Sequence, residues 1–249
     1  MTHRVRRPHP VRKRVLIALF AVVLLTLTGF LAWCGDVAVA TPTALGAVRA
    51  DADIRFSQTG SAVVLTPTAG ATGTGLLFVP GAKVAADAYA YKLAGLVHAG
   101  ITVVIPKPFL NLAFFDPRPA SSFTGLAPDV DHWFVGGHSL GGVRACQFAS
   151  DPGVAGLVLL GSYCANDLSG TGLRVLSIGG QNDGLSTPQK IADAADDLPA
   201  DAAFLELPGV NHASFGDYGP QAGDGTSTVP SADVAAELTS LITAFATRP

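Results

Sequence analysis

The chain has 249 residues, of which 49% are hydrophobic and 14% charged, and its formal net charge is −3. Residues 1–14 hold six basic residues and no acidic one, so the remaining 10 basic and 19 acidic residues give the rest of the chain a net charge of −9. An acidic body argues against nucleic-acid binding. The length fits one domain with or without a tail. The three cysteines lack the spacing of a metal site, and we expect neither a metal nor a cofactor.

Residues 15–33 carry no charge. As a helix this segment would span about 28 Å, close to the thickness of a bilayer's hydrocarbon core. The basic residues at 1–14 precede it, so the positive-inside rule predicts a cytoplasmic N-terminus and an extracytoplasmic body. We expect a retained single-pass signal anchor in the cell membrane, because the apolar run exceeds the usual ~7–15 residues of a cleaved signal.

Two alternatives remain for this segment. Residues 38–40 read Ala-Val-Ala, a possible cleavage site whose use would release a secreted protein, and Cys34 offers a lipid-anchored form. All three versions export the body. Residues 34–52 are rich in Ala, Thr, Pro and Gly without a period, which predicts a linker.

From residue 53 to residue 249 apolar strands alternate with helices. Continuous apolar strands separated by helices predict a three-layer α/β sandwich around a mostly parallel sheet. The expected strands are 53–57 and 62–66, which form an opening hairpin, and 74–79, 101–105, 131–135, 154–160, 173–178 and 203–207. The expected helices are 87–99, 186–197 and 231–247.

One long connection, residues 106–128, interrupts this alternation. It holds several phenylalanines and leucines among prolines. Long connections in compact domains often have a function. The stretch is either an apolar wall or lid over a site, or a loop with a short helix packed on the edge of the sheet.

The stretch Gly137-His138-Ser139-Leu140-Gly141 follows an apolar run and precedes a helix-like segment. This matches the G-x-S-x-G nucleophile elbow, in which a sharp turn between strand and helix exposes the serine. Such a turn needs small flanking residues, because a Cβ there would collide with its neighbours.

A serine hydroxyl needs an adjacent base, and the base needs a carboxylate to fix its tautomer. In parallel sheets these groups come from the carboxyl ends of strands. Asp183 follows the strand 173–178, and His212 follows the strand 203–207. The order Ser139, Asp183, His212 is the one expected for a hydrolase of this architecture.

Other acids and histidines are weaker candidates. Asp167, after the strand 154–160, is the rival acid. His138 adjoins Ser139, so its ring cannot easily reach that hydroxyl, and we expect it to pack. His98 lies in a helix, and His132 begins a strand on the far side from the site.

A tetrahedral intermediate also needs two backbone N–H donors. We expect one from Leu140, directly after the nucleophile. The second should come from the turn after the strand 74–79, where Gly81 permits a close approach; Ala82 is the expected donor, with Lys83 beside it at the mouth.

Export permits a disulfide between Cys146 and Cys164, but we do not expect one. Cys146 should lie about 10 Å along the helix from Ser139, whereas Cys164 should lie near the upper end of the next strand. Disulfides require Cα atoms within about 7 Å.

The elbow, acid and histidine segments resemble the α/β-hydrolase superfamily, and more narrowly the small capless bacterial α/β-hydrolase fold-5 proteins related to dienelactone hydrolases. The resemblance spans about residues 60–247 and implies a serine hydrolase of ester-like bonds. Dienelactone hydrolases use a cysteine nucleophile, and this chain has Ser139, so their substrate does not carry over. The matching segments are 78–84, 105–107, 110–114, 136–142, 180–184 and 211–219.

These observations predict a membrane-tethered, extracytoplasmic serine hydrolase acting on small-molecule carboxylic esters, with modest acyl esters as the first expectation. Acyl transfer on the same three residues is an alternative, and so is a non-catalytic binding protein of the same fold.

Overall fold

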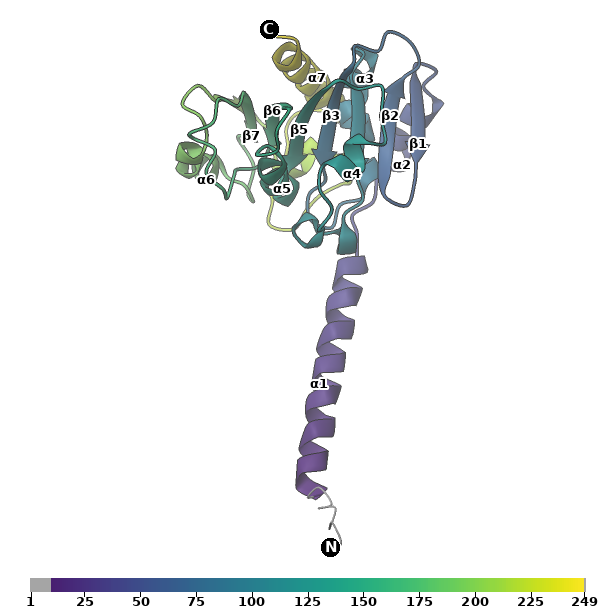
Figure 1. Ribbon diagram of the computed structural model, residues 1–249, viewed down its shortest axis with the longest axis vertical. Coiled ribbons are helices and arrows are strands. Elements are labelled where there is room, and N and C mark those ends of the chain that lie inside the picture. The colour runs from purple at the N-terminus through teal and green to yellow at the C-terminus, as the bar shows by residue number, and fades with distance from the viewer. Residues whose placement is uncertain (1–9, 249) are drawn as a thin grey trace, which may run out of the picture. The chain divides into compact units, whose positions relative to one another are not determined.

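The computed structural model describes residues 10–248, so Arg4, Arg6 and Arg7 of the basic tip lie outside it. The chain divides into two compact units, Met1–Asp36 and Val37–Pro249 (Figure 1).

The first unit is the helix α1, Pro10–Gly35. Within its stretch Val11–Gly35 an 18-residue window reaches a mean hydropathy of 2.7, and this is the one segment within residues 10–248 long and apolar enough to cross a membrane. The hydroxyls of Thr26 and Thr28 donate to the carbonyls of Val22 and Leu24, at 2.9 and 2.8 Å, which satisfies both groups inside the helix. By length and composition α1 is a candidate membrane span, and a signal sequence would have the same properties.

The second unit is built on an eight-stranded sheet with the order β1-β2-β4-β3-β5-β6-β7-β8. β2 is antiparallel to β1 and β4, and all other neighbouring strands are parallel. The predicted α/β architecture is confirmed. The strands are β1 Ile54–Gln58, β2 Ala62–Pro67, β3 Thr74–Val79, β4 Thr102–Pro106, β5 His132–His138, β6 Val154–Leu160, β7 Val175–Gly180 and β8 Ala203–Leu207.

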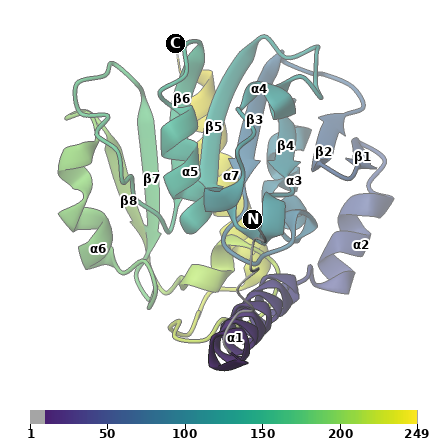
Figure 2. The same cartoon turned by 60° about the horizontal axis from the view of Figure 1, so that its bottom comes forward.

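The sheet separates two apolar cores because successive side chains of a strand point to opposite faces. In β3, Leu76 and Phe78 belong to the core under α3 and α7, whereas Leu77 and Val79 belong to the core under α4 and α5. Figure 2 shows α5 in front of the sheet and α7 behind it. The helices of this unit are α2 Pro42–Ala50, α3 Ala90–His98, α4 Ser121–Thr124, α5 Leu140–Phe148, α6 Pro188–Asp193 and α7 Ser231–Thr247.

Short 3-10 helices replace parts of the expected elements. The expected helix 87–99 begins as a 3-10 turn, and the expected helix 186–197 ends in one after Asp193. The connection after β4 contains two more such turns and α4. These turns are η1 Ala86–Tyr89, η2 Phe109–Asn111, η3 Ala113–Phe115, η4 Ala195–Asp197 and η5 His212–Phe215.

The segment predicted as a linker is ordered from the start of the second unit. Ala38 pairs with Val84 in an isolated parallel bridge, and α2 follows with Pro42 in its first turn, where a missing N–H costs nothing. Val48 of α2 is buried in the core beside α3. The linker prediction is therefore wrong for this stretch: Leu45 and Val48 lie three residues apart on one helix face, a signal that the small residues around them conceal.

Candidate active site

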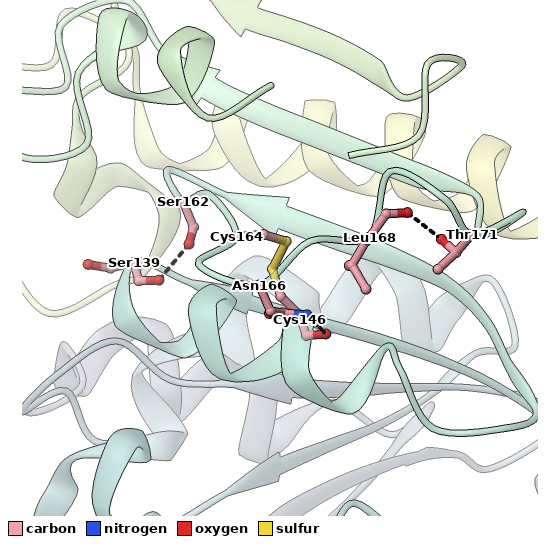
Figure 3. The surroundings of a disulfide bond; sticks show 7 residues. All are labelled: Ser139, Cys146, Ser162, Cys164, Asn166, Leu168 and Thr171. Atoms are coloured by element: carbon pink, nitrogen blue, oxygen red, sulfur yellow. Dashed lines mark hydrogen bonds between the residues drawn. A yellow bond between two sulfur atoms is a disulfide. The ribbon is translucent and has the colours of Figure 1, made fainter. Parts of the chain in front are cut away.

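The nucleophile elbow joins β5 to α5 at Ser139. This residue has φ 53° and ψ −129°, a conformation that side chains rarely adopt and that costs of order 1–3 kcal/mol. A Cβ on Gly141 would overlap the carbonyls of Val79 and Pro80, so the turn is tight enough to require glycine there. The Ser162 hydroxyl donates to the Ser139 carbonyl at 2.6 Å and fixes the turn from the other side (Figure 3).

Asp183 and His212 meet beyond the carboxyl ends of β7 and β8. The two side chains are fully buried, and His212 Nδ1 lies 2.8 Å from Asp183 Oδ2. Asp183 Oδ1 accepts the N–H groups of Leu185 and Ser186 at 2.8 and 2.7 Å, which holds the carboxylate in place. Because Nδ1–H donates to the carboxylate, Nε2 keeps its lone pair, and within residues 10–248 it has no hydrogen-bond partner.

The rival groups from the sequence have other partners. Asp167 is exposed and accepts the N–H and hydroxyl of Ser169 at 2.8 and 2.6 Å, as a turn-forming residue does. His98 pairs with Asp51 at 2.9 Å, and His132 is exposed at the start of β5. The structure pairs His212 with Asp183 rather than with Asp167.

The elbow and the histidine loop adjoin each other. The ring of His138, the residue before Ser139, lies with its centroid 4.3 Å from that of His212. Ser139, directly after His138, therefore lies at the same end of the sheet as Asp183 and His212.

The two expected N–H donors lie in neighbouring turns. Leu140 is the first residue of α5, so its N–H has no acceptor within the helix. Around Ala82, the N–H groups of Gly81 and Lys83 already donate to Tyr89 Oη at 3.0 Å and to the Asn111 carbonyl at 2.8 Å. The tight packing of Gly141 on the Pro80 carbonyl brings this turn against the start of α5.

Comparison with known proteins agrees with this geometry. A family model described as the alpha/beta hydrolase family matches residues 75–236. The chain belongs to this family. No curated protein sequence matches the chain.

Two solved structures of the same fold are similar to it. The esterase domain of a Rhodothermus marinus protein is 16% identical with a TM-score of 0.57, and the match covers 78% of this chain and 97% of that one. TT1662 from Thermus thermophilus is 11% identical with a TM-score of 0.55, and the match covers 79% and 99%. At these identities the likeness shows the fold, and the family membership supports an enzyme of the hydrolase kind.

His138 in this α/β hydrolase does more than pack. Tyr89 Oη accepts the Gly81 N–H at 3.0 Å and shares a hydrogen bond with His138 Nδ1, 2.9 Å away. Burial, and secondly the repulsion that a protonated His212 would exert, hold the pKa of His138 well below its usual value, which favours a neutral imidazole. Sequence reasoning missed Tyr89, because nothing near residue 89 marks it as a partner of the elbow.

Asp224 is a second residue that sequence reasoning missed. Its Oδ1 accepts the N–H groups of Gly184 and His212, both at 3.1 Å, and its Oδ2 accepts that of Ala213 at 2.9 Å. One carboxylate thus joins the loop of the acid to the loop of the base. Its position between Gly223 and Gly225 is the only local signal, and it reads equally well as a turn.

Cys146 and Cys164 form a disulfide, with Cα atoms 5.6 Å apart (Figure 3). The prediction that they would not pair is wrong. β6 ends at Leu160, and Gly161, with φ 50°, turns the chain so that it passes over α5 before it reaches Cys164. Four residues beyond the end of a strand gave the chain enough length to return to the helix.

Proposed function

We propose that this α/β hydrolase is a serine hydrolase that cleaves carboxylic esters of small molecules, with Ser139 as nucleophile, His212 as base and Asp183 as the orienting acid. The observation that carries the proposal is the buried 2.8 Å contact between His212 Nδ1 and Asp183 Oδ2 beside a serine in a strained elbow. A buried, fully bonded carboxylate next to an imidazole whose other nitrogen is unpartnered is the arrangement a general base requires.

The chemistry follows from these positions. Ser139 Oγ attacks the ester carbonyl carbon while His212 Nε2 takes its proton, and Asp183 stabilises the imidazolium. The negative charge on the tetrahedral oxygen is received by the N–H groups of Leu140 and Ala82. Collapse releases the alcohol, which takes the proton from Nε2. Water then attacks the acyl-enzyme in the same way and frees the acid.

The neutral state of His138 suits this cycle. A second positive charge 4.3 Å from His212 would oppose formation of the imidazolium. Its low pKa, caused first by burial, keeps that charge away at neutral pH.

A groove in the connection after β4, joined to the donor turn through Asn111, supports acyl esters as substrates. It has a volume of about 730 Å³ and is lined by residues including Phe109, Leu110 and Phe115, within the usual size range of small-molecule sites. Asn111 in its wall is bonded to Lys83, one residue after the expected donor Ala82. We further propose that α1 is retained as a single-pass anchor with the second unit on the extracytoplasmic side, since basic residues precede the apolar helix.

A fluorophosphonate probe tests the nucleophile directly. It should label the wild-type chain and leave Ser139→Ala unlabelled, while the two proteins have the same melting temperature. Folded wild-type protein that resists the probe would refute the proposal. Product analysis with an added alcohol separates hydrolysis from acyl transfer, and fractionation of cells with N-terminal sequencing tests the anchor.

A further inference from the structure

The connection after β4 presents three phenylalanines to solvent. In this aromatic loop, residues 107–118, the side chains of Phe109, Phe114 and Phe115 are 59%, 71% and 48% exposed. Single exposed apolar residues are ordinary, but a cluster of large aromatic ones marks an interaction surface.

Hydrogen bonds within the loop hold these phenylalanine rings in their exposed positions. The buried carboxylate of Asp116 accepts the Phe109 N–H at 3.2 Å and the Arg118 N–H and Nε at 3.1 and 2.8 Å. Arg118 Nη2 donates in turn to the Lys107 carbonyl at 2.7 Å, which closes the loop. The polar groups are thus turned inward and bonded, and the aromatic rings are left on the outside.

The loop lies where the chain enters the second unit. Ala38 is bonded to the turn at Lys83 on both sides, since its N–H donates to the Lys83 carbonyl at 2.8 Å and its carbonyl accepts the Ala85 N–H at 2.9 Å. The Lys83 N–H donates in turn to the Asn111 carbonyl of the loop at 2.8 Å. One cleft of about 430 Å³ is lined by Val37 and Val39 from the entering chain together with Pro108 and Asn111 from the loop.

This position limits the distance between the loop's base and a membrane. α1 ends at Gly35 and the second unit begins at Val37, so the connection offers about 7 Å of reach at ~3.5 Å per residue. If α1 spans a bilayer, the point at which the aromatic loop meets the entering chain must stay close to the lipid surface.

We propose that the aromatic loop docks on the lipid surface of the bilayer that holds α1, with its phenylalanine rings inserted at the interface. The attraction is apolar rather than electrostatic, because residues 15–249 carry a net charge of −9 and anionic lipids would repel them. The proposal requires the retained anchor; it does not require turnover.

Tryptophan reporters in the full chain, reconstituted into phosphatidylcholine vesicles, test this docking. Phe114→Trp places a reporter at the tip of the loop. Phe204→Trp is the matched control, because Phe204 is 43% exposed on β8, the edge strand at the end of the sheet. Both variants share the native Trp33 and Trp133, so the difference from wild type isolates the new ring.

With docking, Phe114→Trp emits at shorter wavelength than Phe204→Trp and loses intensity when the lipid acyl chains are brominated, whereas Phe204→Trp does not. Equal emission and equal quenching of the two variants would overturn the proposal. So would a Phe114→Trp signal shielded from iodide but untouched by bromolipid, since a protein surface, such as a second copy, would then cover the loop. Phe109→Trp provides a second reporter if Phe114→Trp folds poorly.

Two further measurements distinguish apolar docking from electrostatic attachment and from the catalytic role of Ser139. High salt should leave the bromolipid quenching unchanged, and its loss would mean that charge drives the contact, against the proposal. The quenching should also persist in Ser139→Ala, so that a failure of the fluorophosphonate test does not affect docking, and a failure of docking does not affect the nucleophile.

Discussion

The active-site end of the sheet and the aromatic loop are built in opposite ways. Around Asp183 and His212, polar side chains are buried and bonded to one another. In the aromatic loop the backbone and one carboxylate are bonded inward, while phenylalanine rings face out. Both regions follow the carboxyl ends of strands. The difference suggests that buried, hydrogen-bonded polar groups fix the geometry that catalysis needs. Apolar side chains exposed on a hydrogen-bonded loop suit contact with a lipid surface.

The largest loss of activity should follow from neutralising the buried acid Asp183. Asp183→Asn keeps the shape but removes the charge that stabilises the imidazolium, and it permits the wrong tautomer of His212. We expect kcat for ester hydrolysis to fall by about 10⁴-fold, measured with a soluble ester. Asp167→Asn is the control, because Asp167 is exposed and accepts hydrogen bonds from Ser169; a large loss in that variant, with Asp183→Asn active, would reverse the assignment.

The disulfide belongs to the frame of the site. It closes a separation of 18 residues between α5, which begins next to Ser139, and the turn after β6. Replacing both Cys146 and Cys164 by Ala should lower the free energy of unfolding by about 3 kcal/mol, chiefly by loosening the constraint on the unfolded chain. Urea unfolding measures it.

Wild-type protein unfolded with a reductant present should match the double cysteine variant. The bromolipid quenching of Phe114→Trp should be unchanged in the same background at temperatures where the protein stays folded. A double variant as stable as the oxidised wild type would show that the bridge adds nothing to stability.

The parallel sheet and the order Ser139, Asp183, His212 were readable from the sequence, because apolar strand runs and a glycine-rich elbow are local patterns. The role of Tyr89 was not readable, since its hydroxyl meets Gly81 and His138 only after three segments have folded together. The cysteine bridge was missed for the same reason: the path of a loop after its strand is set by packing and by single residues with positive φ, which spacing along the chain does not reveal.

A smaller change tests whether Tyr89 aligns the donor turn with the elbow. Tyr89→Phe keeps the ring but leaves the Gly81 N–H and His138 Nδ1 without their shared partner. We expect kcat to fall about 10-fold with KM nearly unchanged, equivalent to about 1.4 kcal/mol of transition-state stabilisation. Tyr91→Phe, two residues on, is the control. A change in KM alone would mean that Tyr89 shapes the substrate groove instead.

The smallest expected effect on stability comes from Asp116, whose carboxylate holds the aromatic loop through hydrogen bonds from Phe109 and Arg118. Burial alone would raise the pKa of the Asp116 carboxyl, but the hydrogen bonds from Arg118, the Arg118 and Phe109 N–H groups and the Arg118 charge together lower it. A carboxyl whose pKa is depressed by folding adds stability above its unfolded pKa of about 3.9, and that contribution is lost as pH falls through the folded value. Asp116→Asn should therefore cost about 1 kcal/mol or less at pH 7 and should remove this part of the acid sensitivity.

Unfolding by urea at pH 7 and near pH 3 measures the difference, with the exposed Asp129→Asn as control. Asp116→Asn also tests whether docking depends on the hydrogen bonds that hold the loop or only on its three phenylalanines. If the inward polar bonds present the rings, Asp116→Asn combined with Phe114→Trp should be quenched less by bromolipid than Phe114→Trp alone. Equal quenching would mean that the three phenylalanines dock on lipid without the hydrogen bonds of Asp116. Bonded polar groups would then be needed for the geometry of the active site but not for that of the aromatic loop.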